Sequence, residues 1–163
     1  MRHPAEKASW IWIDHNPNTR FLRFSIEFDT PANDALRFHV TADQRFQLRI
    51  DGKEITYGPD RSDLESWRVT TCEVPLRKGH HQIELLVWWI NEDLSMLRAE
   101  SKSGEVPPPN PPMAQMSWRA GFLFVAEGSL ASVLNTGSKK WKVQDLTEAV
   151  CMARKSNLGY HDV

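Results

Sequence analysis

The sequence predicts an all-β fold, namely an antiparallel β-sandwich or jelly roll. Short segments alternate apolar and polar side chains, which is the period of a strand with one buried and one solvated face. Turn sequences separate these segments about every eight to twelve residues, a spacing typical of sandwiches and jelly rolls. A helical pattern is indicated only after residue 144, so we expect a short carboxyl-terminal helix or linker.

The first alternating segments cover residues 22–28, 36–42 and 46–50. Their polar faces favour antiparallel strands with one side in water. The pair Asp51-Gly52 follows the third segment directly. Because this pair tolerates positive φ, it predicts a hairpin to a strand at 55–57.

The later strands are expected at 67–74, 82–90 and 118–126. The second half of 82–90 is apolar at both parities, which predicts a strand that is covered on both faces. A proline-dense loop spans 91–112. We expect one more short strand at 130–134.

Composition favours one folded domain and excludes several function classes. The chain has 163 residues, with 20 Lys+Arg, 21 Asp+Glu and a net charge of −1. No basic field exists to attract nucleic acid or an anionic membrane surface. No apolar run reaches the roughly 18 residues of a membrane span, and no signal peptide is evident, so we expect a cytoplasmic protein. Cys72 and Cys151 are expected to be reduced thiols.

Four acidic residues on the predicted strands are candidate catalytic groups. They occupy the polar parity, where solvated carboxylates are expected, so we predict that this chain alone has no catalytic residues. A small glycosidase using Glu84 or Glu127 is the alternative. The acidic residues concerned are Glu27, Asp43, Glu84 and Glu127.

No metal site is expected. His80 and His81 are neighbours on a strand and point to opposite faces, so they cannot grip one ion. The turn 60–63 offers carboxylates and a hydroxyl that suit calcium, but its spacing matches no calcium loop. A calcium ion at that turn is a weaker alternative to the prediction that the protein has no cofactor.

Tryptophan is unusually frequent, with seven residues in the chain. Its ring can stack on the C–H face of a sugar while neighbouring polar groups bond the hydroxyls. Trp67 follows a polar turn in the sequence, and Trp88 is predicted to share a strand face with Glu84. Each tryptophan can instead anchor the core or a loop. With the polar residues of nearby strand ends, the two suggest a carbohydrate-binding patch.

Several motifs resemble the amino-terminal accessory β-sandwich of bacterial α-L-rhamnosidases, a galactose-binding-like jelly roll. In that family an Ala-Asp-x-Arg-aromatic strand leads to an Asn-Gly or Asp-Gly hairpin, and a Gly-Pro-x-Arg-x-Asp turn comes next. Here residues 41–55, then 58–63 and then Trp67 show this order. The segment 75–89 is similar to the family's next loop and strand, although His81 stands near the usual Asn.

The first and last parts of the match are 8–12 and 141–143, which look like the opening and closing strands of that domain. The resemblance implies an accessory domain at 1–143 and a helix or linker at 144–163 toward a downstream catalytic domain. The catalytic carboxylates of such enzymes lie in that other domain.

The resulting hypothesis is a non-catalytic, carbohydrate-associated domain of a glycoside hydrolase. Its expected partners are a rhamnose-containing glycan and the sister catalytic domain, with substrate recognition or interdomain packing as its role. The alternatives are a purely structural packing module without sugar affinity and a free-standing sugar-binding protein. The candidate carbohydrate-binding residues are Asp43, Arg45, Arg61, Asp63, Trp67 and Trp88.

Overall fold

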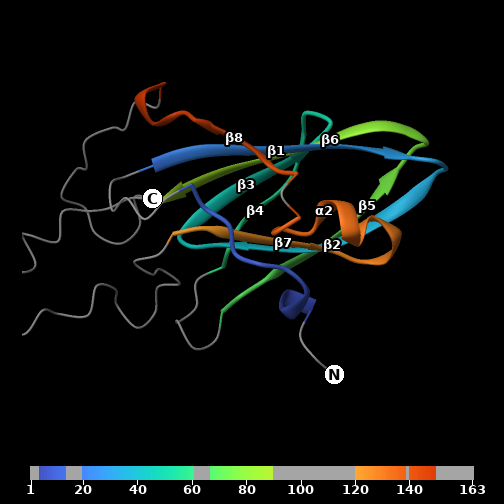
Figure 1. The fold of residues 1–163 in the computed structure, drawn as a ribbon, viewed down its shortest axis with the longest axis horizontal. Coiled ribbons are helices and arrows are strands. Elements are labelled where there is room, and N and C mark those ends of the chain that lie inside the picture. Colours follow the sequence, from blue (N-terminus) through green and yellow to red (C-terminus); the bar gives the residue numbers. More distant parts are fainter. Residues whose placement is uncertain (1–3, 14–19, 61–66, 90–119, 139, 150–163) are drawn as a thin grey trace, which may run out of the picture.

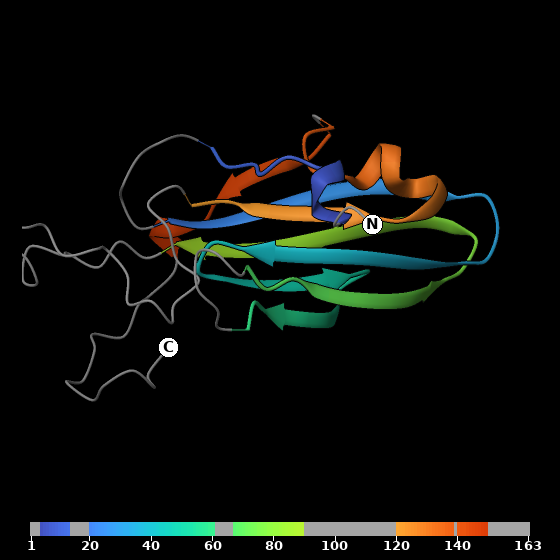
Figure 2. The same ribbon diagram turned by 90° about the horizontal axis from the view of Figure 1, so that it is seen from below.

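The computed structural model describes residues 4–13, 20–60, 67–89, 120–138 and 140–149. Two antiparallel sheets pack face to face, as the sequence predicts (Figures 1 and 2). The larger has the strand order β4-β3-β6-β1-β8 and the smaller β5-β2-β7. The strands are β1 (Arg20–Thr30), β2 (Asp34–Ala42), β3 (Arg45–Ile50), β4 (Lys53–Gly58), β5 (Thr70–Leu76), β6 (Gly79–Trp89), β7 (Phe122–Ala126) and β8 (Lys142–Asp145). The helical turns are η1 (Pro4–Lys7), η2 (Gly128–Leu130), α2 (Ala131–Leu134) and η3 (Thr147–Ala149).

The core lies between the sheets and is built from one parity of each long strand. Along β1 every second residue is buried, and the intervening charged residues are exposed. This is the pattern expected when one sheet face excludes water and the other contacts it. The fully buried aromatic side chains of the core are Phe38, Phe46, Phe122 and Phe124.

The predicted hairpin is present between β3 and β4. Asp51 and Gly52 both have positive φ, 51° and 76°. Two consecutive positive φ values match the right-handed twist of paired strands in a two-residue hairpin.

The strand expected at 130–134 is wrong, because this segment forms the helical turns η2 and α2. Leu134 is buried and Leu130 is half-buried. Their separation of four residues places both on one side of a helical turn, and the same spacing also fits the alternation of a strand.

The expectation that the second half of β6 is covered on both faces is also wrong in part. Leu86 and Trp88 point away from the core and are only half-buried.

The strand predicted at 118–126 is shorter in the structure. Among its described residues, only Phe122–Ala126 are extended in the sheet, because Ala120 and Gly121 have positive φ. The predicted loop 91–112 lies outside the described residues.

The closing strand pairs with β1 and continues two residues beyond the expected 141–143. The sandwich then continues into η3, where Thr147 Oγ1 accepts a hydrogen bond from the Phe21 N–H at 3.0 Å. Asp145 accepts from the Thr147 N–H at 2.9 Å and so caps this turn. Residues 150–163, where the longer helix or linker is predicted, lie outside the described residues.

The two ends of the sandwich differ. The β1–β2 and β5–β6 connections lie together at one end, which we call the turn end (Figure 1). At the other, the loop end, the register places Arg20 beside Trp89 and Ala42 beside Phe122. No helix in the described ranges is long and apolar enough to cross a lipid bilayer.

Candidate functional site

The described candidate residues gather at the loop end. Strand pairing puts Arg45 opposite Trp88, and Asp43 follows the end of β2. Trp67 lies shortly before β5, whose Thr70 pairs with Val40. The register therefore places these four described residues toward the loop end of the sandwich. Arg61 and Asp63 lie outside the described residues.

Trp67 and Asp43 belong to the side of the three-stranded sheet. The Trp67 indole N–H donates to Thr41 Oγ1 at 3.1 Å, and its ring meets Trp10 edge-on with centroids 5.2 Å apart. Asp43 is 1% exposed, and its backbone N–H donates to the Gly121 carbonyl at 2.8 Å. These contacts favour an anchoring role for Trp67.

Trp88 lies on the other side of the molecule, on the outer face of the five-stranded sheet. It is half-buried and stands opposite Phe21, with ring planes within 15° and centroids 6.5 Å apart. Its other neighbour across the sheet is Arg45, whose Nη1 donates to the Gln44 carbonyl at 2.8 Å. An aromatic ring can stack on a sugar ring, and a guanidinium fixed beside it can donate hydrogen bonds to the sugar hydroxyl groups, so this arrangement suits sugar binding.

Tyr57 extends this aromatic surface and is absent from the sequence prediction. It is 74% exposed and pairs across strands with Gln47, which in turn pairs with Leu86 on β6. Directly paired residues point to the same face of a sheet, so Tyr57 shares the outer face with Trp88. Tyr57 pairs with Gln47, which belongs to the polar residues of β3, and this position in the predicted hairpin could have indicated that Tyr57 is exposed.

Ion pairs occupy the part of this face nearer the turn end. Arg23 Nε lies 4.0 Å from Glu84 Oε1, and Lys142 Nζ lies 3.5 Å from Glu27 Oε2. The carboxylates of Glu27 and Glu84 therefore have cationic neighbours on their own sheet. Exposed pairs of this kind contribute little stability, but they compensate charge locally.

A second polar cluster lies on the outer face of the three-stranded sheet. His39 is buried, its Nε2–H donates to Glu127 Oε1 at 2.7 Å, and its Nδ1 lies 2.8 Å from the Thr71 hydroxyl oxygen. The hydrogen bond from His39, with help from the Arg37 guanidinium, holds the pKa of Glu127 below its ordinary value. Next to this cluster is a depression of about 260 Å³. The sequence singled out Glu127 but not its histidine partner.

The positions of Glu84 and Glu127 bear on the glycosidase alternative. Glu84 pairs with Ser25 and Arg49 on the outer face of the five-stranded sheet, whereas Glu127 bonds residues on the outer face of the other sheet. A glycosidase needs two carboxyl groups across one cleft. Glu84 and Glu127 lie on opposite sides of the sandwich and cannot form such a pair.

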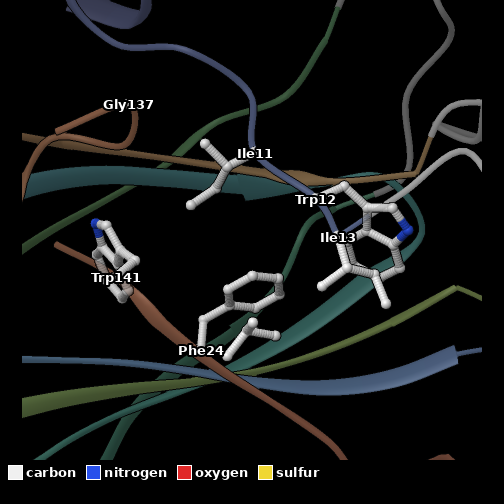
Figure 3. A pocket seen from close by; sticks show the side chains of 7 residues that line it. Ile11, Trp12, Ile13, Phe24, Gly137 and Trp141 are labelled. Carbon is white, nitrogen blue, oxygen red and sulfur yellow. The ribbon is translucent and has the colours of Figure 1, made fainter. Parts of the chain in front are cut away.

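A cavity of about 340 Å³ lies between the amino-terminal segment and the β1–β8 edge (Figure 3). Its walls are mainly apolar. The Trp12 indole nitrogen points away from Trp141 and has no hydrogen-bond partner among the described residues. The residues that line the cavity are Ile11, Trp12, Ile13, Phe24, Gly137, Trp141 and Val143. It offers an apolar surface rather than a set of catalytic groups.

Within the described ranges, no group of three or more His, Cys, Asp or Glu residues is arranged to hold a metal ion. Of the turn considered for calcium, only Asp60 is described, and it is exposed. The alternative of a calcium ion there stays a prediction.

Comparisons of the sequence with protein-family models and with curated proteins find no match. A structural comparison finds a crystal structure of a GH78 family rhamnosidase of Bacillus sp. GL1, with a TM-score of 0.60 and 21% identity. The match covers 85% of this chain but 13% of that one. The likeness is one of fold: this β-sandwich is similar to one part of a much longer rhamnosidase.

Proposed function

We propose that this chain is a non-catalytic, carbohydrate-associated β-sandwich of an α-L-rhamnosidase-like glycoside hydrolase. It contributes to substrate recognition or packs on the catalytic domain. The observation that carries the proposal is the fold match over 85% of the chain to part of a rhamnosidase. The sequence motifs at 41–55 and 58–63, which resemble the accessory domain of the same enzymes, support it independently.

The outer face of the five-stranded sheet is the best-supported sugar-binding surface. Trp88 and Phe21 present adjacent, nearly parallel rings there, with Arg45 beside them. Trp67 and Asp43 are engaged in the protein instead, so we assign the contact with sugar to Trp88 and Arg45.

Titration of the purified chain with L-rhamnose and methyl α-L-rhamnoside, followed by NMR, tests this proposal. We expect weak binding that Trp88→Ala lowers by about 1 kcal/mol, roughly fivefold, because a stacking contact is lost. Val143→Ala, an exposed apolar position in the cavity at the β8 edge, is the control and should leave affinity unchanged. Parallel titrations in calcium and in EDTA test the calcium alternative. No binding under any condition would overturn sugar recognition.

A structural packing role without sugar affinity is the second candidate. Two exposed apolar side chains of the described surface, Ile13 and Val143, lie together around the cavity at the β8 edge. Such surface commonly marks contact with another protein or domain. Tight association with the separately produced catalytic domain, together with absence of sugar binding, would favour this role.

A catalytic role for the isolated chain is tested by hydrolysis of an aryl α-L-rhamnoside. We expect no hydrolysis. Activity that disappears in Glu84→Gln or Glu127→Gln, while the fold is kept, would revive the glycosidase alternative.

A further inference from the structure

Two aromatic side chains stand apart on the same outer sheet face. Tyr57 is on β4 and Trp88 is on β6, with β3 between them. Gln47 of β3 pairs with Tyr57 on one side and with Leu86 on the other. Trp88 therefore lies two strands across and two residues along from Tyr57.

In a regular sheet this offset corresponds to roughly 12 Å between the two positions. That distance exceeds the width of one pyranose ring. A single sugar cannot stack on both side chains at once, whereas two separate rings of one chain can.

The surface between the two aromatic residues is polar. Gln47 and Arg45 are neighbours on the outer face of β3, and both lie between β4 and β6. The Gln47 amide donates to Glu54, and Arg45 donates to the Gln44 carbonyl, so each side chain is held in place. Amide and guanidinium groups between two aromatic rings match the hydroxyl groups of a glycan that crosses the strands.

The charge distribution indicates the nature of that glycan. Along this face Glu84 lies beside Arg23, Glu27 lies beside Lys142, and Glu54 pairs across the strands with Arg49. The described charges are thus balanced within the face and form neither an acidic nor a basic field. A neutral ligand complements such a surface better than a polyanion does.

We propose that this face binds an extended, neutral oligosaccharide, with one sugar ring on Trp88 and another ring of the same chain on Tyr57. The inference rests on the proposed carbohydrate-associated function and specifies its ligand. Trp88 forms the primary contact beside Arg45, and Tyr57 forms a second contact that only a longer chain reaches. Affinity then depends on chain length.

The test compares methyl α-L-rhamnoside with a rhamnose tetrasaccharide by calorimetry. We expect the tetrasaccharide to bind at least fivefold more tightly. Tyr57→Ala should remove this gain and leave the affinity for the monosaccharide unchanged. Tyr57→Phe, which keeps the ring, is the matched control and should retain the gain. Tyr57 is 74% exposed, so these variants are expected to fold normally even where Trp88→Ala does not.

The outcomes separate the two proposals. Equal affinity for both sugars, or a chain-length gain that survives in Tyr57→Ala, overturns the extended site but leaves a single-sugar site at Trp88. Absence of binding by both probes overturns the carbohydrate-associated function itself. A tetrasaccharide gain that disappears in Tyr57→Ala and is kept in Tyr57→Phe supports the extended site.

Discussion

His81 is a buried histidine whose two ring nitrogens both face acceptors. Nδ1 lies 2.7 Å from Asp51 Oδ2, and Nε2 lies 2.7 Å from the Arg77 carbonyl. A carbonyl can only accept, and an ionised carboxylate likewise, so this arrangement favours the imidazolium form, in which both nitrogens donate. The Phe28 ring packs beside it, with centroids 5.5 Å apart.

The surroundings shift the pKa values of both His81 and Asp51. The hydrogen bond to Asp51 raises the pKa of His81 above its ordinary value despite burial, and the Arg77 carbonyl and the Asp29 charge act in the same direction. Burial by itself would raise the pKa of Asp51, but hydrogen bonds from the Gln82 N–H and from His81, with the charges of His81 and His80, outweigh it and lower that pKa.

These directions predict a pH-dependent stability. The contribution of His81 is complete below the ordinary histidine pKa of about 6.5 and is lost as pH rises through the raised folded value. That of Asp51 is present above about 3.9 and is lost as pH falls through its lowered folded value. Stability from the pair is therefore greatest in mildly acidic solution.

Urea unfolding between pH 6 and pH 9 checks this prediction. We expect His81→Gln to cost about 1 to 2 kcal/mol at pH 6 and less at pH 9, because the variant lacks the charged hydrogen bond. His80→Gln is the matched control, since its side chain is 64% exposed and pairs with Asp29 at the surface. An unchanged pH slope in His81→Gln would show that the ring is neutral in the folded protein.

At the scale of elements, the amino-terminal segment completes the smaller sheet. Ile11 and Phe122 exchange two backbone hydrogen bonds, of 3.1 and 3.2 Å. Gly121 sits at the contact with φ of +123°, and a Cβ there would lie 3.2 Å from the Ile11 carbonyl oxygen. The close approach of two backbones explains the need for glycine.

Gly121→Ala is expected to lower the free energy of unfolding by about 1 to 3 kcal/mol, through strained φ and displacement of Ile11. Gly128→Ala is the control, because Gly128 also has positive φ, +72°, but has open space around its Cα. It should show only the strain of the backbone conformation, about 1 kcal/mol. Thermal unfolding that is equally affected in both variants would argue against the contact with Ile11.

The differences between expected and observed elements have local causes. The segment at 130–134 is too short for its apolar spacing to distinguish a helical turn from a strand. On β6, apolar residues at both parities predict a strand buried on both sides, yet the outer face holds half-buried Leu86 and Trp88. The sequence pattern shows which residues are apolar, whereas the packing of the sheets decides which of them are covered.

At the scale of the whole molecule, exposed apolar side chains surround the cavity at the β8 edge. Ile13 and Val143 line it and are 38% and 47% exposed. If this edge packs on a catalytic domain, the isolated chain exposes the contact surface, and we expect it to self-associate at high concentration.

Sedimentation velocity over a concentration series measures this association. The double variant Ile13→Ser, Val143→Thr should shift the protein toward monomer, because it removes exposed apolar area. Tyr57→Ala, on the outer sheet face, is the comparison and should leave the association unchanged. A wild-type chain that stays monomeric throughout would count against a packing surface at this edge.

The sequence by itself determined the fold class, most of the strands and the Asp51-Gly52 hairpin. These properties follow from alternation and turn chemistry, which are local along the chain. Only the tertiary structure decided that Trp67 donates a hydrogen bond to Thr41, whereas Trp88 and Tyr57 share the outer face of the larger sheet. It also decided that His39 donates a hydrogen bond to Glu127. Such relations depend on sheet order and register between distant segments, which the local sequence pattern does not specify.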